Sequence, residues 1–172
     1  MMNILIHDRK GNDGGSIIHA NWSALLNNEE TKVISDNGKI NRCTCCFGCW
    51  LKTPGQCVIK DGYENMGRLF STCDKLIIIS RCFYGMYSPF VKNVLDRGAC
   101  PYLLPYFKTR NGETHHPKRY KNKIALTAYF YGKIPDAEKE TARKLVKANG
   151  VNLFSKTEVF FYDSFEEIKG VS

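Results

Sequence analysis

The sequence predicts an α/β fold built on a parallel sheet, and three observations support this. Short apolar runs typical of strands alternate with segments whose apolar residues recur at helical spacing. The clearest run, residues 75–80 (KLIIIS), is continuously apolar, as expected for a strand buried on both faces. The chain has 172 residues, with 43% hydrophobic and 24% charged, which favours one domain, 1–172, around one core. Alternating strands and helices imply helices on both faces of the sheet.

Five strands are expected along the chain. Each contains a short run rich in Ile, Leu, Val, Phe or Tyr, and the first begins almost at the N-terminus. They are residues 3–8, 31–35, 75–80, 123–131 and a part of 151–162.

Helices are expected between these strands, and three of them carry end signals. Ser16 is a good N-cap for a helix over residues 16–26. Pro89 stands at a first-turn position of a helix that runs through Leu95. Residues 136–150 place acidic residues early, basic residues late and a glycine at the end. The other helical segments are 61–73 and 163–170.

The N-terminal region and the cysteine content bear on where the protein works. The longest apolar run is far too short to span a bilayer, and the first ten residues lack the pattern of a signal peptide. A cytoplasmic location without a membrane partner is therefore expected. In a reducing compartment the eight cysteines are expected to be ligands, redox groups or buried thiols rather than disulfides.

Much of the net charge of +8 lies in residues 108–123, which hold six Lys or Arg against one Glu. A solvated loop, attraction of a phosphate-bearing cofactor or acidic redox partner, and nucleic-acid binding are all consistent with such a segment. The segment lacks a known nucleic-acid-reading motif, so nucleic acid is the partner least favoured.

Ligands of an open parallel sheet bind at the carboxyl ends of the strands, so the ligand site is expected at three loops: 8–15, 81–87 and 129–135. The first loop is polar and runs into a helix N-terminus, where backbone N–H groups favour an anion. It does not contain either of the phosphate-loop motifs G-x-x-x-x-G-K-[ST] and G-x-G-x-x-G.

The second and third loops are rich in aromatic residues. Phe83 and Tyr84 could contact a flat ring, Gly85 would let backbone approach it, and Tyr129 could hydrogen-bond the ring or a substrate. A phosphate site beside two aromatic loops suits flavin mononucleotide (FMN). The alternative is that these aromatics simply cover the end of the sheet.

Two separate motifs resemble a known family. Residues 73–97 (CDKLIIISRCFYGMYSPFVKNVLDR) are similar to the flavin-loop segment of NADPH-dependent FMN reductases and related multimeric flavodoxins, and the cysteine loop 43–62 resembles one that many of them carry. This resemblance implies a flavodoxin-like three-layer α/β/α sandwich with a five-stranded parallel sheet in the order 2-1-3-4-5. It also implies bound FMN, a nicotinamide co-substrate, and a homodimer or homotetramer.

By position, the resemblance assigns the phosphate loop to residues 7–16 and the flavin loop to residues 80–88. Two departures from the family pattern predict FMN binding that is weak, altered or lost: acidic Asp8 and Asp13 stand in the phosphate loop, and Arg81 and Cys82 replace a proline and a small apolar residue. The expected cofactor-binding residues are Asp8, Arg9, Lys10, Ser16, Ser80, Arg81, Cys82, Phe83, Tyr84, Gly85 and Tyr129.

The cysteines Cys43, Cys46, Cys49 and Cys57 have the spacing C-x2-C-x2-C-x7-C, which can wrap one [4Fe–4S] cube with one thiolate on each iron. This spacing resembles that of iron–sulfur flavoproteins, which implies that an acidic ferredoxin-type partner delivers electrons through a cluster to FMN. A zinc site and metal-free thiols are the alternatives.

The sequence thus predicts an FMN-dependent oxidoreductase that is reduced by NAD(P)H or a ferredoxin-type donor and passes electrons to a quinone, a free flavin or another acceptor. No catalytic side chain is identified. The alternative is an electron carrier, or a relative of the family that has lost FMN.

Overall fold

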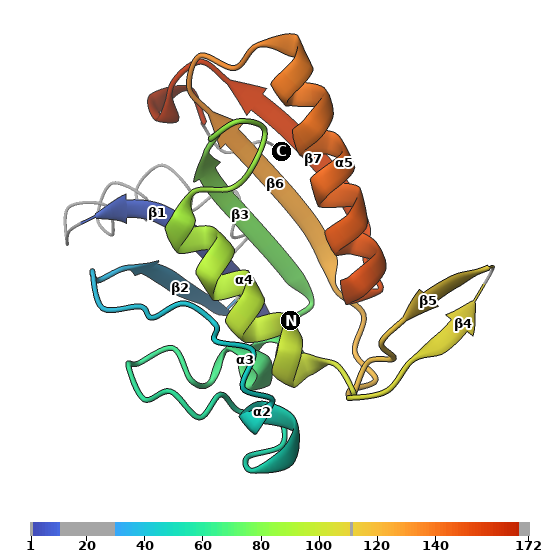
Figure 1. Ribbon diagram of the computed structural model, residues 1–172. Coiled ribbons are helices and arrows are strands. Elements are labelled where there is room, and N and C mark those ends of the chain that lie inside the picture. Colours follow the sequence, from blue (N-terminus) through green and yellow to red (C-terminus); the bar gives the residue numbers. More distant parts are fainter. Residues whose placement is uncertain (1, 11–29, 111, 169–172) are drawn as a thin grey trace.

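The computed structural model describes residues 2–10, 30–110 and 112–168. Its centre is a sheet of five strands, each parallel to its neighbours, in the order β2-β1-β3-β6-β7 (Figure 1). Counted along the chain, this is the predicted order 2-1-3-4-5 of a flavodoxin-like fold. The strands are β1 (Met2–Lys10), β2 (Glu30–Asp36), β3 (Lys75–Arg81), β6 (Ala125–Tyr131) and β7 (Lys156–Tyr162).

Three helices, α3 (Met66–Thr72), α4 (Pro89–Tyr102) and α5 (Asp136–Leu153), cover one face of the sheet (Figure 1). Strand alternation sends Ile78 of β3 into the core beneath these helices, while Ile77 and Ile79 point to the opposite face. On that opposite face, the short helical turn η1 (Phe165–Glu167) packs with them. The helix predicted over 16–26 lies outside the described residues.

Two predicted helix ends differ from the structure. The helix expected over 61–73 begins only at Met66, because the Asp61 carboxylate accepts hydrogen bonds from Asn41, Tyr63 and Arg97 instead of capping a helix. Helix α5 continues past Gly150 to Leu153 and ends where Phe154 adopts a left-handed conformation, with φ of 57°. At Gly150 the helix approaches β7 so closely that a Cβ atom would collide with Thr157. That glycine serves packing rather than termination.

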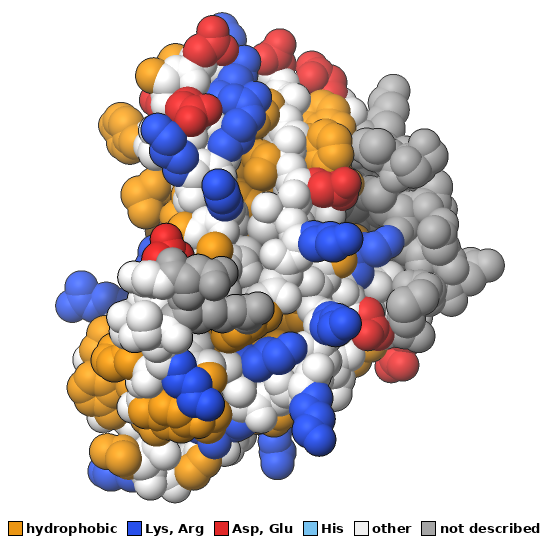
Figure 2. Space-filling view, turned by 90° about the vertical axis from the view of Figure 1, so that its right-hand side faces the viewer, with side chains coloured by type: hydrophobic (Ala, Val, Ile, Leu, Met, Phe, Trp, Pro, Cys, Tyr) orange, Lys and Arg blue, Asp and Glu red, His pale blue; other side chains and the backbone are white. Residues whose placement is uncertain are grey.

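The basic segment, expected as a loop, contains a hairpin of two short strands, β4 (Lys108–Arg110) and β5 (Glu113–His115), which projects from the molecule (Figure 1). Some of its cations are engaged internally: Lys118 Nζ lies 5.6 Å from the centre of the Phe154 ring, and Arg119 Nε donates to Pro101 O. Figure 2 shows Lys and Arg side chains scattered over the face that carries this hairpin rather than gathered in one stripe. None of the described helices is long and apolar enough to cross a membrane.

Candidate functional site

A cavity of about 550 Å³ opens at the carboxyl ends of β1, β3 and β6, where the fold predicts a ligand. A neighbouring cavity of about 530 Å³ shares Arg9, Arg81 and Tyr131 with it and extends toward Lys133. The first cavity therefore has two guanidinium groups and several aromatic rings in its wall. Its described lining is Asp8, Arg9, Asp36, Arg81, Phe83, Ser88, Pro89, Phe90 and Tyr131.

The Asp8 carboxylate, whose charge is unfavourable next to a phosphate, accepts hydrogen bonds from two donors within the protein. Its Oδ2 atom accepts from the Arg81 backbone N–H at 2.8 Å, and its Oδ1 atom accepts from the Tyr131 hydroxyl at 2.8 Å. Burial, together with the neighbouring Asp8 charge, raises the pKa of Tyr131, so its hydroxyl remains a donor at neutral pH. Asp8 thus ties the end of β1 to the ends of β3 and β6. Asp13, the other acidic residue of the loop, lies outside the described residues.

The loop after β3 makes a tight two-residue turn. Phe83 and Met86 exchange backbone hydrogen bonds of 2.9 and 2.8 Å, and Tyr84 and Gly85 both have positive φ, 52° and 77°. A Cβ atom on Gly85 would lie 2.6 Å from Thr141 Cβ and 2.9 Å from Glu138 O. Gly85 is therefore needed for the loop to pack on α5, and the expected approach of its backbone to a flat ring stays a prediction.

The side chains of this loop point in different directions. Arg81 is exposed, and its guanidinium lies 5.6 Å from the centre of the Phe83 ring in the cavity wall. Tyr84 is 86% exposed. Cys82 turns toward α5, with its Sγ 3.9 Å from Glu138 Oε2, and burial raises the pKa of this thiol. Arg81 and Phe83 therefore line the first cavity, whereas Cys82 is half-buried and lines only the neighbouring one.

Two serines near this loop differ in what their hydroxyls do. Ser80 Oγ accepts from the Ser88 backbone N–H at 2.7 Å and donates to Arg81 O. Its hydroxyl therefore stabilises the loop instead of facing the cavity. Ser88 Oγ is buried, lines the cavity and has no hydrogen-bond partner among the described residues. A buried hydroxyl without a partner beside a cavity is a group that a ligand can satisfy.

Of the tyrosines in β6, the sequence predicted Tyr129 as the one at the site, whereas the structure puts Tyr131 in the cavity wall. Tyr129 is 4% exposed and stacks on Phe160 in the core, with ring centres 5.2 Å apart. Tyr131 is the last residue of β6, and this terminal position was the signal that could have identified it. Lys10 belongs to β1, and Ser16 lies outside the described residues.

These residues suit FMN, which carries a phosphate dianion, a polar chain and a flat ring. Arg9 and Arg81 can pair with the phosphate or with ring oxygens. Phe83 and Tyr131 offer aromatic surface, and Ser88 offers a buried hydroxyl that has no partner within the described part of the chain.

Six cysteines line one small cavity of about 110 Å³ next to α2 (Gly48–Leu51): the four predicted ligands Cys43, Cys46, Cys49 and Cys57, together with Cys45 and Cys100. Within the described part of the chain, no three His, Cys, Asp or Glu side chains converge on a point that could hold a single metal ion. A [4Fe–4S] cube spreads its four sulfur ligands over four irons, so the same observation does not test a cluster.

The cysteine loop is fastened to α4 by buried polar contacts. The Arg97 guanidinium is 1% exposed and donates to both oxygens of Asp61, at 2.6 and 3.0 Å, and to the backbone oxygens of Asn41 and Ile59. Trp50 Nε1 donates to the backbone oxygen of Cys100, three residues further along α4. Arg97 thus has a structural role, and the segment that it holds is the cysteine loop.

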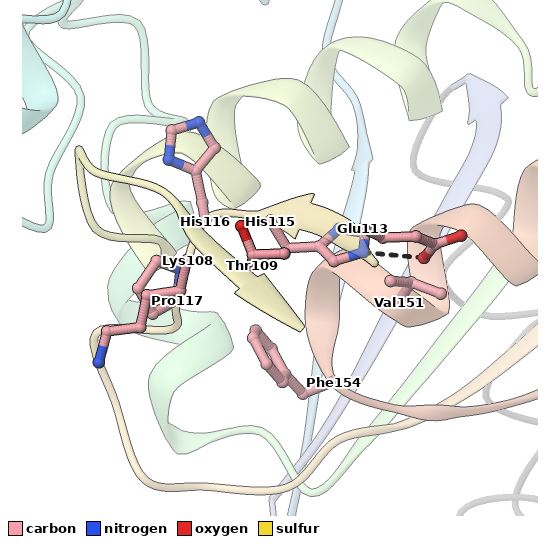
Figure 3. A pocket seen from close by; sticks show the side chains of 8 residues that line it. All are labelled: Lys108, Thr109, Glu113, His115, His116, Pro117, Val151 and Phe154. Carbon is pink, nitrogen blue, oxygen red and sulfur yellow. Dashed lines mark hydrogen bonds and ion pairs between the residues drawn. The ribbon is translucent and has the colours of Figure 1, made fainter. Parts of the chain in front are cut away.

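Another cavity, of about 510 Å³, lies between the β4–β5 hairpin and the end of α5 (Figure 3). His115 pairs with Glu113 at 3.0 Å, while the ring of His116 packs between Trp50 and Phe107. The wall of this cavity is mainly apolar. The hairpin lies between α4 and the start of β6, so the cavity is at the amino ends of the strands, away from the edge where flavodoxin-like folds bind ligands.

Comparison with known proteins gives a distant sequence relative and several solved structures of the same fold. No family in the collection of family models matches the chain. An iron–sulfur flavoprotein of Archaeoglobus fulgidus is 32% identical over 105 residues, which cover 60% of this chain but only 44% of that protein.

Three solved structures are similar to nearly the whole chain. An azoreductase from Bacillus anthracis str. Sterne has a TM-score of 0.59 at 12% identity and covers 95% of this chain and 88% of its own. An FMN-dependent NADH-azoreductase from Bacillus anthracis str. Ames Ancestor, solved with FMN, has a TM-score of 0.54 at 13% identity, with the same coverage. An NADPH-quinone reductase from P. pentosaceus has a TM-score of 0.51 at 9% identity and covers 95% and 85%. The chain therefore has the flavodoxin-like fold shared by FMN-dependent reductases, which confirms the resemblance found in its sequence.

Proposed function

We propose that the protein is an FMN-dependent reductase that binds FMN at the carboxyl edge of its sheet and takes electrons from NADH or NADPH. The observation that carries the proposal is the cavity there, which combines Arg9, Arg81, the buried Ser88 hydroxyl and aromatic rings. A structure of the same fold is described as an FMN-dependent NADH-azoreductase in complex with FMN.

The residues of the chain would bind and orient the cofactor rather than take part in proton transfer. Arg9 and Arg81 would neutralise its phosphate or polarise its ring oxygens, and Ser88 would donate a hydrogen bond. Asp8 would keep the Tyr131 hydroxyl fixed in the wall. When bound, FMN accepts a hydride from a nicotinamide and passes electrons to the acceptor.

Turnover assays test the activity. The purified chain, supplied with FMN, should oxidise NADPH or NADH in the presence of a quinone or an azo dye, and the rate should depend on FMN. FMN binding without nicotinamide oxidation would instead favour the electron carrier. In that case the net charge of +8 makes an acidic protein donor the partner to try next.

Arg81→Ala should weaken FMN binding about tenfold to a hundredfold. The substitution removes one cation from the cavity wall, and a hydrogen bond to a charged group contributes about 1.5–3 kcal/mol, with about 1.4 kcal/mol for each tenfold change. Arg143→Ala is the matched control, because Arg143 also lies over a ring, 4.9 Å from the centre of Phe161, but lines neither cavity at the carboxyl edge. Fluorescence titration measures both. Equal losses in the two variants would contradict a role for Arg81 in the site.

The iron–sulfur cluster on Cys43, Cys46, Cys49 and Cys57 stays a prediction. It is supported by the spacing of these residues, by their common cavity and by the distant relative that is called an iron–sulfur flavoprotein. About four irons with acid-labile sulfide per chain, in protein purified without oxygen, is the expected result if a cluster is present. A homodimer or homotetramer is likewise a prediction, to be tested by light scattering.

A further inference from the structure

Next to the cavity proposed for FMN, here called the flavin cavity, lies the second carboxyl-edge cavity of about 530 Å³. It is formed where the ends of β6 and β7 meet the turn η1 (Figure 1). The two cavities share Arg9, Arg81 and Tyr131, so ligands bound in them would lie next to each other along this common wall. A molecule that exchanges electrons with a flavin has to lie against it. The second cavity is therefore placed, and large enough, for a small-molecule redox substrate.

Charged side chains make up much of the wall of the second cavity. Five of its ten lining residues carry a charge at neutral pH, and three of these are positive. The described lining therefore has a net charge of +1. The five are Arg9, Arg81, Lys133, Asp163 and Glu166.

Lys133 is the cation that lines the second cavity but not the flavin cavity. Arg9 and Arg81 line both, so FMN would engage them from the other side. Lys133 is exposed, and within the described part of the chain no carboxylate forms an ion pair with it. The backbone before it is anchored, because the Gly132 N–H donates to Tyr162 O at 3.1 Å. Lys133 is thus the cation that remains for a second ligand.

The second cavity also offers aromatic surface to a flat ligand. The rings of Tyr131 and Phe165 meet edge to face, with centres 5.6 Å apart. The Arg9 guanidinium lies 5.0 Å from the centre of the Phe165 ring. Guanidinium planes stack on aromatic rings as well as pairing with anions. An aromatic ligand can therefore stack in this cavity while its charged group meets Lys133.

We propose that the second cavity binds the electron acceptor and that Lys133 selects aromatic acceptors with one negative group, such as a sulfonate or a carboxylate. The inference rests on the proposed function, since the acceptor is reduced only beside bound FMN. A net charge of +1 suits a single negative charge, and Asp163 and Glu166 would repel further ones. A nicotinamide dinucleotide carries several phosphate charges, so it fits this cavity less well than a compact monoanion.

Two azo dyes that differ in charge test the inference: methyl orange carries a sulfonate, and its sulfonamide is uncharged. Full reduction of the azo bond takes four electrons and four protons, supplied as two hydrides from two molecules of NADPH or NADH and two protons from water, and yields two amines. The kcat/KM of the FMN-loaded chain is measured for each dye. The preference for methyl orange is the ratio of the two values, and comparing this ratio between variants cancels the intrinsic reactivity of the dyes.

Lys133→Gln should lower the preference for methyl orange about threefold to fivefold, the effect of one partly exposed charge pair, and leave the affinity for FMN unchanged. Asp163→Asn should raise the preference, because it removes a negative charge from the same wall. Lys139→Gln is the matched control, since Lys139 pairs with Asp136 at 3.3 Å and lines neither cavity. Calorimetric titration of methyl orange into the FMN-loaded chain, without nicotinamide, should give the same order of affinities.

Equal preferences in the wild type and Lys133→Gln would overturn the inference. A loss of FMN affinity in this variant would do the same, because it would assign Lys133 to the cofactor site. A wild-type chain that reduces both dyes equally well, and binds methyl orange no better than the sulfonamide, would overturn the inference and leave the proposed function intact. A chain that oxidises neither NADPH nor NADH with either dye would overturn both.

Discussion

Replacing Arg97 by Met should lower the free energy of unfolding by about 3–5 kcal/mol, the usual cost of removing one partner of a buried ion pair. Arg97 is 1% exposed, and its guanidinium satisfies Asp61 and two backbone oxygens at once. Met has similar length but no donors, so the carboxylate and both carbonyls would lose their partner. Urea unfolding followed by circular dichroism measures the change.

The control lies on the same helix. Lys92 and Asp96 form an i,i+4 pair whose side chains are 42% and 40% exposed. An exposed pair of this kind contributes less than about 1 kcal/mol, so Lys92→Met should change stability little. Losses of equal size in the Arg97 and Lys92 variants would contradict the view that Arg97 fastens the cysteine loop.

The ion pair between Arg97 and Asp61 also predicts how the stability of the fold depends on pH. Burial opposes ionisation of Asp61, but the hydrogen bonds from Arg97 and Asn41 prevail and hold the pKa of this carboxyl well below its usual range. A lowered native pKa contributes stability that is fully present above the unfolded pKa of about 4 and is lost as the pH falls below it. The stability difference between wild type and Asp61→Asn should therefore be constant above about pH 5 and shrink below about pH 4. A difference that grows on acidification would contradict the assignment.

Gly85→Ala should weaken FMN binding by about tenfold or more. The left-handed conformation costs a residue with a Cβ atom about 1–2 kcal/mol, and forcing the atom against α5 costs about 1–3 kcal/mol. Side-chain rotation relieves neither close contact, because Thr141 Cβ, at 2.6 Å, is fixed to the backbone and the Glu138 oxygen, at 2.9 Å, belongs to it. We expect the loop to move off α5 and to take Phe83 out of the cavity wall. Titration of the variant with FMN measures the effect.

The Gly112→Ala variant separates the cost of the left-handed conformation from the cost of the collision with α5. Gly112 has a similar φ of 80°, but no described residue beyond its chain neighbours comes within 4 Å of the position of its Cβ, and it stands in the β4–β5 hairpin at the other end of the molecule. This control should lose stability through strain and keep its affinity for FMN. If Gly85→Ala bound FMN as tightly as Gly112→Ala, the loop would not be part of the cofactor site.

The sequence located the strands well, because a buried parallel strand is marked by a continuous apolar run such as residues 75–80. It also located the loops at the carboxyl edge, since these follow directly from the strands. It missed the hairpin within 108–123, whose strands of three residues are too short to leave a periodic pattern.

Individual side chains of the site were harder to predict, because their roles depend on contacts between distant segments. Asp8 stood out as an acidic residue in a phosphate loop, yet its partners are Arg81 and Tyr131 from other strands. Cys100 of α4 lines the same cavity as the cysteines of the loop because Arg97 and Trp50 hold the two segments together. Such contacts are set by the tertiary structure, not by spacing.

Titration of the purified chain with FMN tests the central claim most directly. The claim predicts saturable binding of one FMN per chain, seen as quenched or shifted flavin fluorescence, with weaker binding in Arg81→Ala and unchanged binding in Arg143→Ala. A wild-type chain that is folded by circular dichroism but leaves the flavin signal unchanged would contradict it, and the carboxyl-edge cavity would then not be an FMN site.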